Sequence, residues 1–451
     1  ILKRVDKSLK RYKKCCERVD ENAKRGKQSL ARVDHTASRA NFVLNRVDQN
    51  GFWAGEETFA WVSGPFCGLM SLSRARLFMF AAKKTAFTMK IAIYALLFWP
   101  FLAFSQSNDW QQEVDYKIKV QLDDRAHTLT GDITIGYLNN APQPLTEIKM
   151  HLWANAHRTR NNALVRQMTR TGKSKLYFSP DSLRGGYSGL AFNVDGQPVA
   201  IKYEKNNPDI ATLTLNRPLA PGGRIVITSP FVLKIPGSWS RLGHIGQSYQ
   251  MTQWYPKPAV FDASGWHAIP YLNMGEFYSE FGSFEVEITL PENYVVAATG
   301  VCTNQSEADF LKSRLEMTQN LIKNGFNKKE MAFPRSSTTM KTLHFSANRV
   351  HDFAWFADKR FNVVTDTAVL KSGKKVPTWA FFTNDNAEFW KKGAFYTKRS
   401  VEFYSETVGE YPWPHCTSVH SALSAGAGME YPMITVIGSV RRDKSLDDVV
   451  A

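Results

Sequence analysis

The sequence predicts a β-rich domain that is followed by the first part of a mixed α/β domain. From Val114 onward apolar and polar residues alternate with a period of two, which is typical of half-buried strands. After Phe361 segments with helical spacing join the strands. The chain has 451 residues, of which 43% are hydrophobic, so it is long enough for two or three domains with cores of their own. This composition excludes wholesale disorder and a small disulfide-stabilised scaffold.

The positive charge is concentrated at one end of the chain. The net charge is +16, but residues 1–88 hold 18 Lys and Arg against 8 Asp and Glu, and the remaining residues hold 39 against 33. We therefore expect no nucleic-acid partner for the folded body. Beyond residue 88 the cysteines are Cys302 and Cys416, a spacing that indicates neither a disulfide framework nor a zinc finger.

Residues 1–88 contain an internal repeat, in which Arg-Val-Asp recurs every 14 residues from Arg4 to Arg46. A period of 14 equals two heptads, but the a and d positions are not apolar, which disfavours a coiled coil. The basic run near Lys3 could bind nucleic acid. The interpretation we favour is translated tandem-repeat DNA upstream of a gene, and hence a non-native or disordered basic extension.

Residues 89–105 have the form of a secretory signal peptide. A charged start is followed by the apolar stretch Ile91–Phe104, and the small residues Ala103 and Ser105 occupy the −3 and −1 positions of a cleavage site. We expect Met89 to be the native start and the protein to be exported, to the periplasm or outside a bacterial cell. We expect no stable membrane span after cleavage. The alternative is a signal-anchor helix, which would make the protein membrane-tethered with a basic cytoplasmic arm.

Residues 106–360 are predicted to form the β-rich domain, made of antiparallel sheets. Leu213 and Leu215 are expected to pair with Ile225 and Ile227 across a Pro-Gly-Gly turn. The alternating apolar positions of the other strands are Val114, Tyr116, Ile118, Val120 and Leu122; Leu129, Ile133, Ile135 and Tyr137; and Phe284, Val286, Ile288 and Leu290. The segment 307–324 is helix-like and polar, and we interpret it as an insertion.

Residues 361–451 are predicted to begin the second domain. Val363–Leu370 and Thr378–Phe382 read as strands, and Asp385 is expected to cap a helix with Glu388 three residues later. Apolar residues at helical spacing follow, and Gly409 and two prolines end this helix. The apolar residues at this helical spacing are Trp390, Ala394, Val401, Tyr404 and Val408. A second capping pattern at Ser445 opens an amphipathic turn that stops at Ala451, so we expect the chain to be truncated inside a core helix.

One segment near the end of the chain suits a peptide ligand. Small residues at 426–428 precede Met429 and Glu430, and Met433–Ile437 reads as a strand. The exposed edge of a strand can pair with a peptide backbone, and a carboxylate at its end can pair with a free ammonium group. The alternative is a Gly-rich loop with a solvated Glu.

This segment, Gly-Ala-Gly-Met-Glu-Tyr-Pro at 426–432, resembles the G-x-M-E-N exopeptidase motif of the aminopeptidase N family of zinc metallopeptidases. Thr252–Pro258 resembles the T-Q-x-x-P region of that family. Gly275–Gly282 and His351–Trp355 are similar to a bacterial branch of it. The resemblance spans about Trp110 to the end of the chain.

The resemblance implies a saddle-shaped β domain followed by the start of a thermolysin-like α/β catalytic domain. It implies an aminopeptidase that removes N-terminal residues from peptides, in which Glu430 binds the substrate's α-amino group and Gln253 contacts the same end. Ala427, Gly428 and Met429 complete the substrate-binding set. The sequence departs from the family's pattern because Tyr431 replaces the motif's Asn and Ala427-Gly428 replaces its Gly-Ala. Tyr255 replaces the acidic or amide residue that stands two positions after the Gln.

The family's H-E-x-x-H zinc motif, whose helix places two His ligands on one face with a Glu base between them, does not occur in the 451 residues. In the family it lies one turn into the helix that follows the exopeptidase strand, which corresponds to 445–451 here. We therefore expect zinc in a complete enzyme, and neither catalytic residues nor bound zinc in this chain.

Other chemistry-bearing residues are expected to be structural. His415, Cys416 and His420 are close in sequence, but their spacing is not that of a helical ligand pair, so we do not favour a metal site there. The stretch Trp254–Trp266 is interpreted as core packing. Four scattered histidines, His244, His267, His344 and His351, are interpreted as hydrogen-bonded structural residues. A non-catalytic relative that binds peptides in the same groove remains an alternative function.

Overall fold

The computed structural model describes residues 110–421, 428–438 and Leu446. The chain divides into two compact units, Ile1–Leu96 and Leu97–Ala451, and every described residue belongs to the second. The predictions for 1–88 and 89–105 therefore lie outside the described residues. Within the described part of the chain, no helix is both long enough and apolar enough to cross a membrane.

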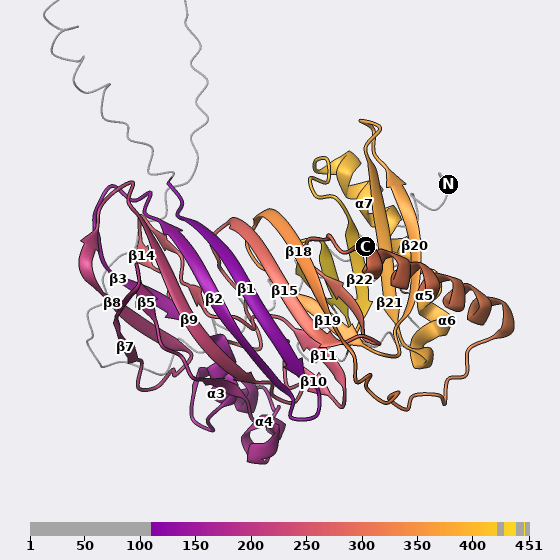
Figure 1. The fold of residues 1–451 in the computed structure, drawn as a ribbon, viewed down its shortest axis with the longest axis horizontal. Coiled ribbons are helices and arrows are strands. Elements are labelled where there is room, and N and C mark those ends of the chain that lie inside the picture. The colour runs from indigo at the N-terminus through magenta and orange to yellow at the C-terminus, as the bar shows by residue number, and fades with distance from the viewer. Residues whose placement is uncertain (1–109, 422–427, 439–445, 447–451) are drawn as a thin grey trace, which may run out of the picture. The chain divides into compact units, whose positions relative to one another are not determined.

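A nine-stranded sheet forms the first layer, and Figure 1 shows its long strands side by side. The alternating side chains predicted for β1, β2 and β15 are buried, which confirms these strands. The pairing of β1 with β15 is parallel, so the expectation of purely antiparallel sheets is wrong at this point. In spatial order the strands are β17 (Val301–Cys302), β18 (Met340–Val350), β15 (Gly282–Pro291), β1 (Glu113–Asp123), β2 (Thr128–Leu138), β9 (Arg224–Lys234), β5 (Asn193–Val194) and β6 (Gln197–Pro198), with β4 (Gly186–Ser188) also paired to β9.

A second sheet has the order β12 (Lys257–Pro258), β3 (Leu145–His151), β8 (Ile210–Leu219) and β7 (Ala200–Tyr203). The predicted hairpin between β8 and β9 is wrong, because the two strands lie in different sheets. The reason is that the Pro-Gly-Gly turn is hydrogen-bonded to Asn139, which directly follows β2. Its backbone exchanges hydrogen bonds with Gly222 (2.7 Å) and Gly223 (2.9 Å), and its Nδ2 donates to Leu219 O (3.1 Å).

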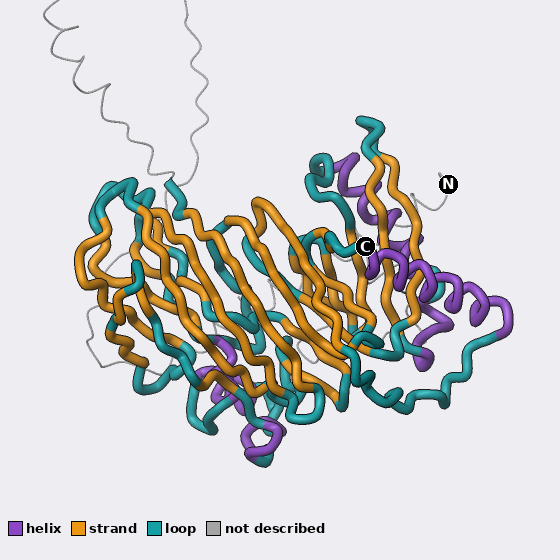
Figure 2. The backbone as a smooth tube through the Cα atoms, viewed as in Figure 1, coloured by secondary structure: helices purple, strands orange, loops and turns teal. Residues whose placement is uncertain are grey.

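Shorter elements complete this part of the chain. A four-stranded sheet has the order β10 (Gly243–Ile245), β11 (Ser248–Met251), β19 (Trp355–Asp358) and β16 (Val295–Ala298), and β13 (Phe261–Asp262) pairs with β14 (Gly265–Trp266). The helical segments are η1 (Trp153–His157), α3 (Ala163–Arg170), α4 (Lys175–Phe178) and η2 (Asp181–Leu183). Asn162 caps α3 by accepting a hydrogen bond from Val165 N (3.0 Å). Figure 2 shows that strands and loops dominate here, with few helical turns.

The last sheet has five strands and mixed pairing, in the order β20 (Asn362–Val369), β21 (Lys375–Phe382), β22 (Cys416–His420), β24 (Ile434–Ile437) and β23 (Gly428–Tyr431). The strands predicted at 363–370 and 378–382 are confirmed as β20 and β21. The helices are α5 (Gln305–Asn324), η3 (Asn384–Asn386), α6 (Ala387–Trp390) and α7 (Gly393–Thr407). α6 and α7 cover one face of the sheet, and α5 packs against β20 (Figure 1).

The two faces of this sheet are packed differently because side chains alternate along a strand. On one face Phe381, Val419 and Val436 share a core with Phe356 of β19 and with α5. On the other face residues such as Phe382 share a core with α6, α7 and Leu446. The helix predicted at 307–324 is therefore confirmed, and its Phe310, Leu311 and Leu315 contact the first of these cores. The domain boundary at residue 360 stays a prediction.

The helix predicted after Asp385 is interrupted. Asp385 makes no capping hydrogen bond, and its carboxylate accepts from the Thr383 hydroxyl instead. The helical run breaks between Trp390 and Gly393, which gives α6 and α7. Of the apolar residues at helical spacing, Trp390, Ala394 and Val401 are buried, whereas Tyr404 (47% exposed) and Val408 (83% exposed) are not.

Candidate functional site

The predicted peptide-binding segment forms the edge strand β23. Its register along β24 pairs Gly428 with Ile437 and Glu430 with Thr435. The strand predicted at 433–437 as the open edge is instead the internal strand β24, because β22 and β23 pair with it on either side. It begins at Ile434, one residue later than predicted, since Met433 adopts a left-handed φ of +64° in the tight turn before it. The sheet order leaves the outer backbone groups of β23 unpaired within the described residues. The edge is therefore residues 428–431, and Ala427 lies outside the described residues.

Side chains of β23 point to opposite faces of the sheet. Met429 and Tyr431 lie on the face that packs against β16 and β19, and Glu430 lies on the other face and is exposed. Arg241 Nε donates a hydrogen bond to Met429 Sδ over 2.8 Å. Burial raises the pKa of the Tyr431 hydroxyl far above its ordinary value, so it stays neutral. The strand is thus held on one face while its carboxylate remains accessible on the other.

Arg241 connects β23 to a loop of the β-rich part of the chain. Its guanidinium is buried and donates to the carbonyl oxygens of Leu272 (3.1 Å), Asn273 (3.1 Å) and Gly275 (3.2 Å). The carbonyl oxygens and the Met429 thioether take the place of a carboxylate partner in these contacts. The segment that begins at Gly275 and the exopeptidase-like strand, far apart in the sequence, are therefore joined by one side chain.

The other predicted contact, Gln253, belongs to a buried cluster around Asp352. Gln253 Nε2 donates to Asp352 Oδ2 (2.7 Å), and Tyr255 Oη donates to Oδ1 (2.7 Å). Phe353 N also donates to Oδ1 (2.9 Å), and Lys257 Nζ lies 3.3 Å from Oδ2. The segments 252–258 and 351–355, far apart in the sequence, thus meet at one carboxylate. Burial lowers the pKa of Lys257, and the nearby Asp352 charge opposes this shift.

Gln253 is buried within this cluster, away from solvent. Its Nε2 is engaged by Asp352, its Oε1 has no hydrogen-bond partner among the described residues, and its φ is +55°. No hydrogen bond or ion pair joins Gln253 to Glu430 in the described part of the chain. The joint role of these two residues at a peptide's amino end stays a prediction.

The residues that could bind a metal do not converge. His415 uses Nε2 on Gly300 O (2.7 Å) and Nδ1 on Thr417 Oγ1 (3.2 Å), so both its nitrogens are engaged. Cys416 and His420 belong to β22, and their side chains point to the face that α6 and α7 cover, whereas His415 contacts the opposite face. Among residues 110–421, 428–438 and 446 there is no group of three His, Cys, Asp or Glu suited to a metal. These residues do not fit a zinc site.

The remaining histidines and aromatics match their structural interpretation in part. His244 Nδ1 bonds Gly246 O (2.9 Å), and His267 Nε2 lies 2.8 Å from Asp262 Oδ2. Trp254 is fully buried, and its Nε1 donates to Phe353 O (2.9 Å), which confirms its place in the core. His344, by contrast, is exposed, and its ring nitrogen lies 4.0 Å from a Glu287 oxygen. His351 stacks edge-on against the Phe281 ring.

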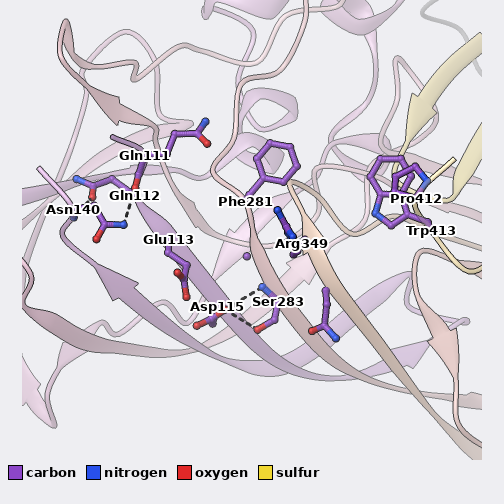
Figure 3. Close-up of a pocket in the computed structure, with 12 residues that line it drawn as sticks. Gln111, Gln112, Glu113, Asp115, Asn140, Phe281, Ser283, Arg349, Pro412 and Trp413 are labelled. Carbon is purple, nitrogen blue, oxygen red and sulfur yellow. Dashed lines mark hydrogen bonds between the residues drawn. The ribbon is translucent and has the colours of Figure 1, made fainter. Parts of the chain in front are cut away.

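A broad polar cavity of about 1190 Å³ lies between the starts of β1 and β15 and the loop at Pro412–Trp413 (Figure 3). Its acidic side chains are already paired. Asp115 accepts from Ser283 N (3.0 Å), Ser283 Oγ (2.6 Å) and Arg224 Nη1 (3.1 Å). None of the predicted site residues lines this cavity, and its lining residues have no spacing from which the sequence could have predicted it.

Comparison with known proteins gives a likeness of fold. No family model matches the sequence, and no curated protein matches it. Among solved structures, the chain is similar to an M1 zinc metallopeptidase from Deinococcus radiodurans, with a TM-score of 0.43 and 16% identity over 72% of this chain and 60% of that one. A Glu-to-Ala variant of an M1 zinc metallopeptidase from Deinococcus radiodurans, bound to a Tyr-Ser-Ala substrate, matches with the same values.

A third structure is a two-domain M1 zinc metallopeptidase variant bound to L-arginine. Its TM-score is 0.44, with 15% identity over 76% of this chain and 64% of that one. The chain spans less than two thirds of the length of these proteins. The part of the chain that the structure describes is β-rich, with several sheets.

Proposed function

We propose that this chain contains the peptide-binding part of an exported, zinc-dependent aminopeptidase. The observation that carries the proposal is the edge strand Gly428–Tyr431, which has open backbone groups and an exposed Glu430. The resemblance of this strand to an exopeptidase motif supports the proposal that it binds the amino end of a peptide. The signal-peptide pattern at 89–105 is the ground for proposing export.

The proposed binding mode follows from the geometry of the strand. An extended peptide adds to the open edge of β23 through main-chain hydrogen bonds, which are insensitive to its side chains. The Glu430 carboxylate then pairs with the peptide's free ammonium group through a charge-assisted hydrogen bond. Arg241 keeps the strand in place through Met429, on the opposite face from Glu430. This arrangement selects for a free amino terminus over a particular residue type.

Zinc belongs to the proposal only for the complete enzyme. The H-E-x-x-H pattern does not occur in the sequence, and the described residues offer no metal cluster. When bound, zinc would polarise the scissile carbonyl and activate water. The residues of this chain would bind the peptide and orient its amino end.

The test is a binding measurement by isothermal titration calorimetry on the full chain, with one peptide in its free and its N-acetylated form. Glu430→Gln keeps the size of the side chain and removes its charge. We expect it to weaken the free peptide about ten- to a hundredfold, which is the usual worth of a hydrogen bond to a charged group. The acetylated peptide should be unaffected, because it has no ammonium group.

Glu204→Gln is the matched control, since it makes the same change at an exposed residue after β7 and should leave binding unaltered. Equal losses on both peptides would show that Glu430 is structural. Failure of the unmodified chain to bind the free peptide would refute the proposal.

A further inference from the structure

A second cavity, of about 350 Å³, lies on the face of β21 and β22 that is turned away from α6 and α7. It opens between this face, the first turns of α5 and the strands β16 and β17. Its volume is in the range of small-molecule sites. The apolar side chains that line it include Val296, Leu311, Phe345, Trp379 and Phe381. None of the residues of the proposed peptide site is among them.

The first two turns of α5 line the cavity with Glu307, Ala308 and Leu311. Further along, Leu315 packs against the core on this face of the sheet. At the first turn the helix presents the small, exposed Ala308 instead. At the rim Val301 is 44% exposed, so the cavity is reached from solvent. A mostly apolar, accessible cavity of this kind is suited to an apolar ligand.

One polar atom in the lining is left without a partner. Glu307 is 3% exposed, and its Oε2 accepts from Lys341 Nζ over 2.6 Å. Its Oε1 is buried and has no hydrogen-bond partner among the described residues. Two other polar side chains of the lining are engaged, since His415 uses both ring nitrogens and Asn304 bonds the backbone of His344 and Thr342. A buried acceptor without a donor is costly, so a ligand that supplies a donor gains that energy.

We propose that this cavity binds a compact, neutral, fused-ring molecule that donates one N–H or O–H hydrogen bond to Glu307 Oε1. A neutral donor is favoured because Lys341 already balances the Glu307 charge, and an ammonium group would leave a net positive charge in an apolar site. Aromatic rings suit the flat faces offered by Trp379, Phe381 and Phe345. The site is independent of the peptide-binding strand.

The test compares indole with indene, which has nearly the same shape but no N–H donor, by isothermal titration calorimetry on the full chain. We expect indole to bind and indene to bind about ten- to a hundredfold more weakly, the usual worth of a hydrogen bond to a charged acceptor. Ala308→Phe should fill the cavity and abolish indole binding. Ser313→Phe, the same kind of change at an exposed position on the other side of α5, should leave it intact.

Each of three results would overturn the proposal: no binding of indole up to its solubility limit, equal affinities for indole and indene, or unaltered binding by the Ala308→Phe variant. The circular dichroism spectra and unfolding midpoints of the two Phe variants are measured alongside, and they must match those of the unmodified chain. If Ala308→Phe does not fold, Leu311→Trp fills the cavity from the next turn of α5 and takes its place in the comparison. Peptide binding at β23 should not respond to either ligand.

Discussion

Replacing Asp352 by Asn tests whether its charge holds the buried cluster together. Lys257 is 1% exposed, and its Nζ lies 3.3 Å from Asp352 Oδ2, so the substitution leaves a buried ammonium group without a counter-charge. Such a loss typically costs 3–5 kcal/mol of folding free energy. The rings of Trp153 and Tyr255, centred 4.6 and 5.3 Å from Nζ, offset part of this cost. We therefore expect a loss of about 3 kcal/mol.

The assay is urea unfolding of the full chain followed by tryptophan fluorescence, with a double-mutant cycle. Lys257→Met removes the stranded cation, so the double variant should be more stable than the sum of the single losses by about 2 kcal/mol. In the Lys257→Met variant, Asp352 keeps its hydrogen bonds from Gln253, Tyr255 and Phe353 N. Additive losses within about 0.5 kcal/mol, or a loss below about 1 kcal/mol for Asp352→Asn, would refute the reasoning.

Three further predictions concern other parts of the chain. Burial raises the pKa of Glu280 from 4.5 to about 7, and the hydrogen bond that its carboxylate accepts from Phe261 N opposes this shift. The folded state therefore favours the protonated form of Glu280. Its contribution to stability should fall as pH rises from about 4.5 to 7, by roughly 3 kcal/mol. Glu280→Gln should flatten this part of the profile in urea titrations, and an unchanged slope would contradict the assignment. In the Gly282→Ala variant the new methyl group would overlap the Val114 carbonyl oxygen where β15 pairs with β1, so the free energy of unfolding should fall by about 1–3 kcal/mol in urea titrations. The control variant Gly409→Ala, whose methyl group would lie in open space, should change the free energy of unfolding little. Metal analysis of the purified full chain should find far less than one zinc per chain, and stoichiometric zinc removed by a chelator would disprove this.

Strand positions could be predicted from the sequence because the alternation of side chains is a local property. The residues from Val114 to Leu122 carry the period of two whatever their neighbours are, and the structure buries the expected side chains. The strand at 433–437 was also indicated locally, but the edge strand at 428–431, which pairs along it, was not predicted. The strand partners were not predictable in this way. The turn after β8 has the sequence of a hairpin turn, but it is hydrogen-bonded to Asn139, some eighty positions away, and β9 pairs with β2 in another sheet.

The sequence by itself determined the long alternating strands, the helix at 307–324, the position of Glu430 beside the strand at 434–437, and the absence of the H-E-x-x-H pattern from the 451 residues. Only the tertiary structure decided what surrounds these residues. It placed Asp352 against Gln253 and Tyr255, which are 99 and 97 positions away, and left one oxygen of Glu307 unpaired beside an apolar cavity. The physical reason is that secondary structure follows from the periodicity of neighbouring residues, whereas burial, charge pairing and cavities depend on segments that meet only after the sheets have assembled.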